Sequence, residues 1–105
     1  MNTQYNLRIA VLRRTNIGRT AQNEAKEEWP EHGRHSAKRL ALNAGEEIRL
    51  GVKEGKEFLK IEIVGQKVDV QYGDRIRVIA TGKVYRITAD PSRLERVTVL
   101  AAESL

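Results

Sequence analysis

The sequence contains no cysteine, which excludes disulfide bonds and thiolate metal sites. Aromatic residues make up only 5% of the chain, so any core must be built mainly from valine, isoleucine and leucine. No apolar run reaches the roughly 18 residues of a membrane-spanning helix, and the N-terminus lacks the apolar stretch of a signal peptide. A cysteine-free composition is typical of a reducing compartment. We therefore expect a cytoplasmic protein without a membrane partner.

Residues that carry chemistry are also sparse. His32 and His35 lie three positions apart, but no third ligand is nearby, and a catalytic zinc site usually has three protein ligands. Acidic residues are scattered singly or paired with lysine. The one enzymatic alternative that sequence spacing leaves open is a hydrolase whose aspartate and glutamate side chains are brought together by folding. We expect no metal, no cofactor and no enzymatic activity.

The stretch from 46 to 80 alternates apolar and polar residues in four short runs separated by glycines. A period of two places one set of side chains on one face, as in a half-buried strand. The breaks at Gly65-Gln66 and Gly73-Asp74 suit tight hairpin turns, because glycine accepts the positive φ of the first central position. The apolar positions of the four runs are Ile48, Leu50 and Val52; Leu59, Ile61 and Ile63; Val68 and Val70; and Ile76 and Val78.

Similar alternation predicts further strands from Tyr5 to Arg13, over 83–88 and over 94–100, with a fraying tail over 101–105. The 105 residues fit one domain, with a β meander over about 46–100. Closure removes the unpaired strand edges that recruit other chains. We predict a mainly β fold, a small antiparallel barrel of OB-like or SH3-like type with about six to eight short strands. A two-sheet sandwich and a homo-oligomer formed by edge-strand pairing are the alternatives.

Between the first strand and the meander, residues 15–40 predict a basic insertion. Thr15 to Thr20 is typical of a turn or loop, because it contains Asn16 and Gly18. Good helix formers over Ala21–Trp29, with Thr20 as N-cap and Pro30 as terminator, predict one short inserted helix. The polar segment from 30 to 39 predicts an exposed loop. The insertion should protrude from the barrel.

Positive charge is concentrated in the N-terminal part of the chain. The net charge is +5 and the isoelectric point is near 9.8. Residues 1–45 carry eight lysines and arginines against four glutamates, whereas residues 46–105 carry eleven against ten acidic residues. An excess of this kind favours an anionic partner such as nucleic acid, although an exposed, solvated loop has the same composition. The N-terminal candidates for phosphate contacts are Arg13, Arg14, Arg19, Arg34, Lys38 and Arg39.

Arg75 and Arg77 add a second candidate set. They alternate with core positions, so both side chains should leave the same face of one strand, about 6.8 Å apart. That spacing is close to the distance between successive phosphates of an extended strand. The alternative is that they pair with acidic residues across strands for a few tenths of a kcal/mol each.

Two segments resemble known RNA-binding families. Residues 73–78, Gly-Asp-Arg-Ile-Arg-Val, together with Glu-Arg-Val-Thr-Val at 95–99, resemble the closing strands of OB-fold RNA binders of the translation-initiation type. The segments 35–38, 45–46 and 65–67 resemble the tryptophan-regulated RNA-binding attenuation protein, a ring-forming β protein. Both resemblances imply a β fold that binds RNA.

Two functions follow as expectations. The first is a small basic module that binds DNA or RNA, contacting phosphates through its N-terminal basic segment. The second is a protein-interaction module, such as a phage- or plasmid-type inhibitor or assembly component, that binds an acidic partner surface. The salt dependence of binding separates them, because phosphate contacts release counterions.

Overall fold

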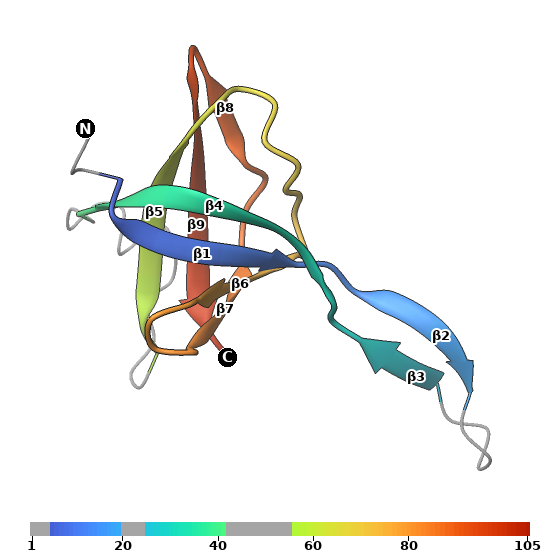
Figure 1. Cartoon of the computed structure of the whole chain (residues 1–105). Helices are drawn as coiled ribbons and strands as arrows, with labels where there is room; N and C mark the ends of the chain where they lie inside the picture. Colours follow the sequence, from blue (N-terminus) through green and yellow to red (C-terminus); the bar gives the residue numbers. More distant parts are fainter. Residues whose placement is uncertain (1–4, 20–24, 42–55) are drawn as a thin grey trace.

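The computed structural model describes residues 5–19, 25–41 and 56–105 and is built from β-strands (Figure 1). Within these ranges there is no helix, and therefore none long and apolar enough to cross a membrane. The nine strands are β1 Leu7–Leu12, β2 Thr15–Arg19, β3 Ala25–Glu28, β4 Glu31–Leu40, β5 Phe58–Val64, β6 Arg75–Val78, β7 Val84–Ile87, β8 Ser92–Leu94 and β9 Val97–Ser104.

Six strands close into an antiparallel barrel. The hydrogen-bonded order is β5-β4-β1-β6-β7-β9, and β9 pairs back with β5 to complete the ring. The last strand makes this possible, because it pairs with β5 along its length and with β8 and then β7 on its other side. The prediction of a small antiparallel barrel is therefore confirmed, and the barrel is consistent with OB-like and SH3-like folds.

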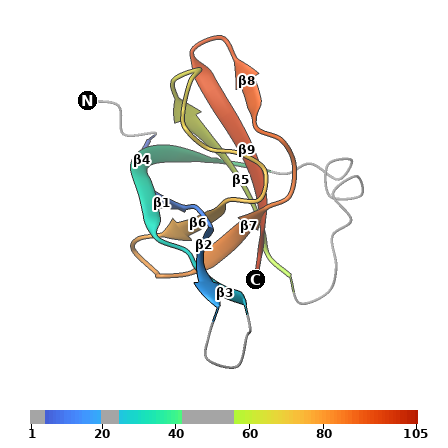
Figure 2. The same ribbon diagram turned by 90° about the vertical axis from the view of Figure 1, so that its right-hand side faces the viewer.

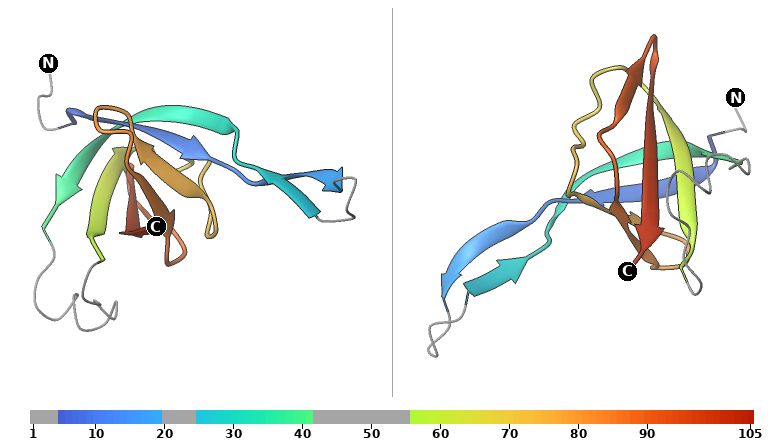
Figure 3. Two further views of the ribbon diagram at one scale, coloured as in Figure 1. Left: turned by 90° about the horizontal axis from the view of Figure 1, so that it is seen from below. Right: turned by 180° about the vertical axis from the view of Figure 1, so that it is seen from behind.

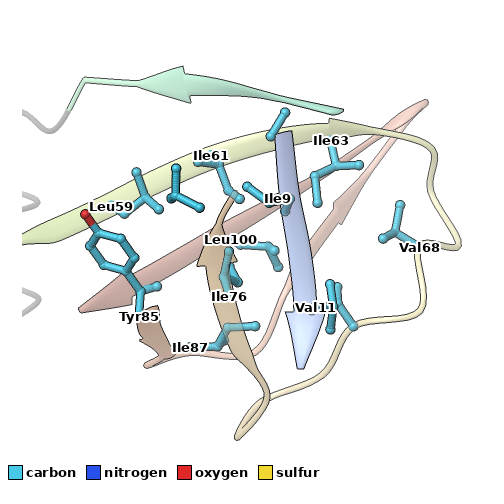
Figure 4. Close-up of a cluster of buried hydrophobic side chains, with 14 residues drawn as sticks. Ile9, Val11, Leu59, Ile61, Ile63, Val68, Ile76, Tyr85, Ile87 and Leu100 are labelled. Atoms are coloured by element: carbon cyan, nitrogen blue, oxygen red, sulfur yellow. The ribbon is translucent and has the colours of Figure 1, made fainter. Parts of the chain in front are cut away.

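Alternating residues of these strands fill the barrel interior (Figure 4). The inward residues of β5 and β9 are apolar or small, and their burial pattern alternates along both strands. The fraying predicted for the C-terminal tail is wrong, because Leu100, Ala102 and Ser104 are buried members of β9. The core side chains are Ile9, Val11, Ala37, Leu59, Ile61, Ile63, Val68, Val70, Ile76, Val78, Tyr85, Ile87, Leu100 and Ala102.

The meander predicted over 46–80 is confirmed for some of its strands, but its strands are not joined by the predicted tight hairpins. The run at 48–52 lies outside the described residues, and β5 and β6 form as predicted. Val68 and Val70 are buried, but their segment is irregular. Gly65 has a φ of 119°, yet the predicted hairpin is absent, because the segment after Gly65 does not pair with β5. The Gly65 N–H instead donates to the carbonyl of Arg96. At Gly73 the positive φ of 92° belongs to the second central position of a turn from Gln71 to Asp74.

The first part of the predicted insertion, β2 and β3, is a two-stranded ribbon that leaves the barrel (Figures 1 and 3). The second part, β4, is a strand of the barrel, so the prediction that the whole insertion protrudes is wrong there. The loop predicted at its start is β2 and the loop over 30–39 is β4, so both predictions are wrong. The predicted helix is wrong where it can be compared, since β3 occupies 25–28; residues 20–24 lie outside the described part. The ribbon continues the β1–β4 ladder: Thr15 pairs with Glu28 at the offset that pairs Leu12 with Glu31. A helix of nine residues, as predicted over Ala21–Trp29, is only marginally stable in water. The hydrogen bonds of the β-ladder therefore decide the conformation of this segment against its helix propensity.

Candidate functional site

The ribbon formed by β2 and β3 is the most distinctive external feature. In Figure 3 it points away from the barrel, and the described residues of β2 pair only with those of β3. Each ribbon strand therefore has one edge that no described strand covers. A two-stranded ribbon on its own is at best marginally stable in water.

A cluster of four charged or polar side chains, here called the base cluster, anchors the ribbon. Arg13 follows β1 and donates from Nε and Nη2 to both carboxylate oxygens of Asp74, at 3.2 and 2.9 Å, and from Nη2 to Asp69 at 3.0 Å. His32 comes from the returning strand, and its Nε2 lies 2.6 Å from the other oxygen of Asp69. A main-chain hydrogen bond joins the two chain segments at the same place, since the N–H of Arg13 donates to the carbonyl of Pro30.

These contacts shift the pKa values of two members of the base cluster, Arg13 and Asp69. The hydrogen bonds that Arg13 donates to Asp74 and to Asp69 raise the pKa of Arg13, with burial acting against them. The contact with His32 and then that with Arg13 lower the pKa of Asp69. Asp74 is 2% exposed and also accepts from the N–H of Gln71. Arg13 therefore holds the barrel to the ribbon.

Five arginines lie at outward positions of four adjacent strands, β4, β1, β6 and β7, which lie next to one another in Figure 2. One row across the strands runs Arg34, Ala10, Arg77. The next runs Glu31, Leu12, Arg75, Arg86 and reaches Glu103 of β9. We call this surface the basic face, and its arginines are Arg8, Arg34, Arg75, Arg77 and Arg86.

Acidic and aromatic neighbours fix the orientation of the basic face's guanidinium groups. Glu31 accepts from Nε of Arg34 at 2.9 Å and from Nη2 of Arg77 at 3.0 Å. Both contacts lower the pKa of Glu31, with that to Arg34 the stronger. The guanidinium carbon of Arg75 lies 3.8 Å from the centroid of the Trp29 ring, a cation–π contact. The arginines are thus held while most of them stay exposed.

The eight residues predicted to contact phosphate have different environments. Arg34, Arg75 and Arg77 come together on the basic face, whereas Arg13 is engaged in the base cluster. The remaining four lie elsewhere: Arg14 between β1 and β2, Arg19 in β2, Lys38 opposite Glu62 and Arg39 opposite Ile61 on β4.

Sequence reasoning missed two members of the basic face, Arg8 and Arg86. A signal for both is present, because each alternates with apolar core positions of its own strand. What the sequence does not contain is the pairing of β1 with β6, which brings residues about 67 positions apart onto one surface.

A second exposed feature is apolar. Val64 pairs with Val97, and Val97 pairs with Leu94, so these three side chains form one row across β5, β9 and β8. Val64 is 61% exposed and Leu94 is 52% exposed. We call them the apolar row. Apolar clusters at a surface commonly mark protein contacts.

The described residues contain no group of three or more histidine, cysteine, aspartate or glutamate side chains able to hold a metal ion. Lys83 and Tyr85 both contact Glu57, and these contacts, that of Lys83 first, lower the pKa of Glu57. Burial, and then the hydrogen bond to Glu57, raise the pKa of Tyr85. These three residues form an ion-paired group close to the end of β9, where the N–H of Glu57 donates to the Ser104 hydroxyl.

Two of the solved structures that resemble this chain cover nearly all of it. The solution structure of protein SF1141 from Shigella flexneri 2a superposes with a TM-score of 0.72 at 20% identity, covering 99% of this chain and 96% of that one. A chain of the virion of a native gene transfer agent particle superposes with a TM-score of 0.61 at 12% identity, covering 94% and 93%. No family model and no curated protein matches. At these identities the likenesses show the fold alone.

Proposed function

We propose that this chain is an assembly component, a small non-enzymatic subunit that contacts neighbouring proteins in a multi-protein particle through its ribbon. The observation that carries the proposal is the ribbon itself, which leaves a closed barrel and has strand edges that no described strand covers. Open edges invite strand pairing, and proteins usually shield them. An edge with this geometry suits a partner strand, whether from another protein or from a second copy.

Two further observations support this role. The apolar row provides a separate patch on β5, β9 and β8 for a second contact, as a subunit with more than one neighbour requires. The fold is shared with a chain of a gene transfer agent virion. We also propose a cytoplasmic setting, which the cysteine-free composition supports.

The test removes the ribbon and keeps the barrel. Arg14 and Trp29 are joined by Asn-Gly in place of residues 15–28, since the adjacent Arg13 N–H and Pro30 carbonyl are already 3.2 Å apart. Arg14, the inserted Asn-Gly and Trp29 then form a four-residue hairpin loop closed by that hydrogen bond, with glycine supplying the positive φ of the turn. Wild type and variant are each co-expressed with the products of the genes flanking their own and separated by size. Thermal unfolding of the variant alone verifies that its barrel is intact.

We expect the wild type to elute in an assembly far above its 11.9 kDa mass and the ribbon-less variant to elute as a free subunit. An intact variant that still enters the assembly would contradict the proposed role of the ribbon. A wild-type chain that stays free under every co-expression would contradict the proposal as a whole.

A further inference from the structure

The basic face has an excess of positive charge that its own acidic residues do not cancel. Its five arginines are accompanied by Glu31 and by Glu103, which Arg86 contacts, leaving an excess of three positive charges. The side chains of Arg34, Arg77 and Arg86 are 52%, 37% and 57% exposed. All three guanidinium side chains are therefore accessible to a ligand.

Strand geometry spaces these arginines regularly, both along one strand and across neighbouring strands. Arg75 and Arg77 are about 6.8 Å apart along one strand, and Arg34 lies two strands from Arg77, about 10 Å away. Glu31 holds Arg34 and Arg77 from between them, while Trp29 holds Arg75. Holding a guanidinium group in advance reduces the entropy lost when a ligand binds.

The composition of the face indicates the partner. The apolar residues at its centre, Ala10 and Leu12, are 0% and 5% exposed beneath the flanking side chains. Protein interfaces usually have an apolar, buried core, whereas nucleic-acid interfaces are polar and strongly positive. Arginine also gives bidentate hydrogen bonds to phosphate.

We propose that the basic face binds the phosphate backbone of a nucleic acid. This proposal goes beyond the role in assembly and does not depend on it, because the face is formed by the barrel and the ribbon is not required. It places the main contact on β4, β1, β6 and β7, and not on Arg13, Arg14 and Arg19.

The experiment compares two double variants of equal net charge. Arg34→Gln with Arg77→Gln removes two charges from the face, and glutamine can still donate to Glu31. Lys67→Gln with Arg96→Asn removes two exposed charges outside the face; Arg96 has a φ of 69°, which asparagine tolerates. Binding of a fluorescent 20-nucleotide DNA duplex and of an RNA strand is measured by anisotropy from about 50 to 200 mM salt.

We expect wild-type binding to weaken linearly on a log–log salt plot. Each lost phosphate contact lowers the slope by about one and weakens binding at 50 mM salt by about tenfold. The face variant should lose about 100-fold and the control variant much less. Equal losses in both variants, or no wild-type binding at 50 mM salt, would overturn the proposal. Equal affinity for polyglutamate would also overturn it, because the face would then recognise carboxylates of an acidic protein.

Discussion

Replacing Arg13 by alanine should destabilise the protein more than any other single loss of surface charge. The change leaves the Asp74 carboxylate, 2% exposed, without the two hydrogen bonds that neutralise it. Removing one partner of a buried ion pair costs about 3–5 kcal/mol. Because the Arg13 side chain is 25% exposed and Asp74 keeps the N–H of Gln71, we expect about 2–3 kcal/mol.

Equilibrium urea unfolding, followed by circular dichroism, measures this loss. Lys67→Ala is the control, since an exposed side chain away from the base cluster should change the free energy of unfolding by less than about 0.5 kcal/mol. In a double-mutant cycle, Arg13→Ala with Asp74→Asn should recover part of the loss, because no charge is left buried. A loss for Arg13→Ala no larger than the control's would refute the assignment of Arg13 to a structural role.

Two more predictions concern the same end of the barrel. Arg93→Ala should cost about 2 kcal/mol in thermal or urea unfolding, because its guanidinium donates to backbone carbonyls of the 66–70 segment, two of them at 2.7 Å; an unchanged midpoint would count against this. The pKa of Asp69 is lowered from 3.8 by His32 and Arg13. The stability it contributes is therefore fully present above that value and is lost as the pH falls through the lower folded-state pKa. Melting temperatures from pH 6 to pH 2 should fall more steeply for wild type than for Asp69→Asn, and parallel curves would contradict the linkage.

The barrel strands were predictable where alternation is local. Tyr5–Arg13 contains β1, and Leu59, Ile61 and Ile63 point inward on β5 as their period indicates. Leu12 directly follows the apolar Val11, so the alternation of apolar and polar residues breaks there, and this break has a structural counterpart. Both Ala10 and Leu12 lie outward yet are buried beneath the flanking arginines.

The ribbon was not predictable from local propensity. Ala25–Glu28 contains good helix formers, but the register of β1 and β4 extends into it and decides its conformation. A β-bulge between Val11 and Leu12 also turns His32 toward Asp69, an orientation that alternation alone does not give.

The basic face was half predictable for a related reason. That Arg75 and Arg77 point outward follows from their period, and the structure bears it out. That they join Arg34 follows only from the closed strand order, which is a long-range property. The sequence pattern also gave no sign that Arg13 would bind a buried aspartate, because Asp74 is 61 positions away.

The most direct test of the role in assembly is amide hydrogen exchange of the ribbon, measured in the isolated chain and in the purified assembly. Backbone amides of 15–19 and 25–28 should exchange fast in the isolated chain, because the ribbon's described strands pair only with each other. They should become strongly protected in the assembly, while the barrel strand β5 stays protected in both. Equal exchange of the ribbon in the two states would contradict the claim that the ribbon is the contact between subunits.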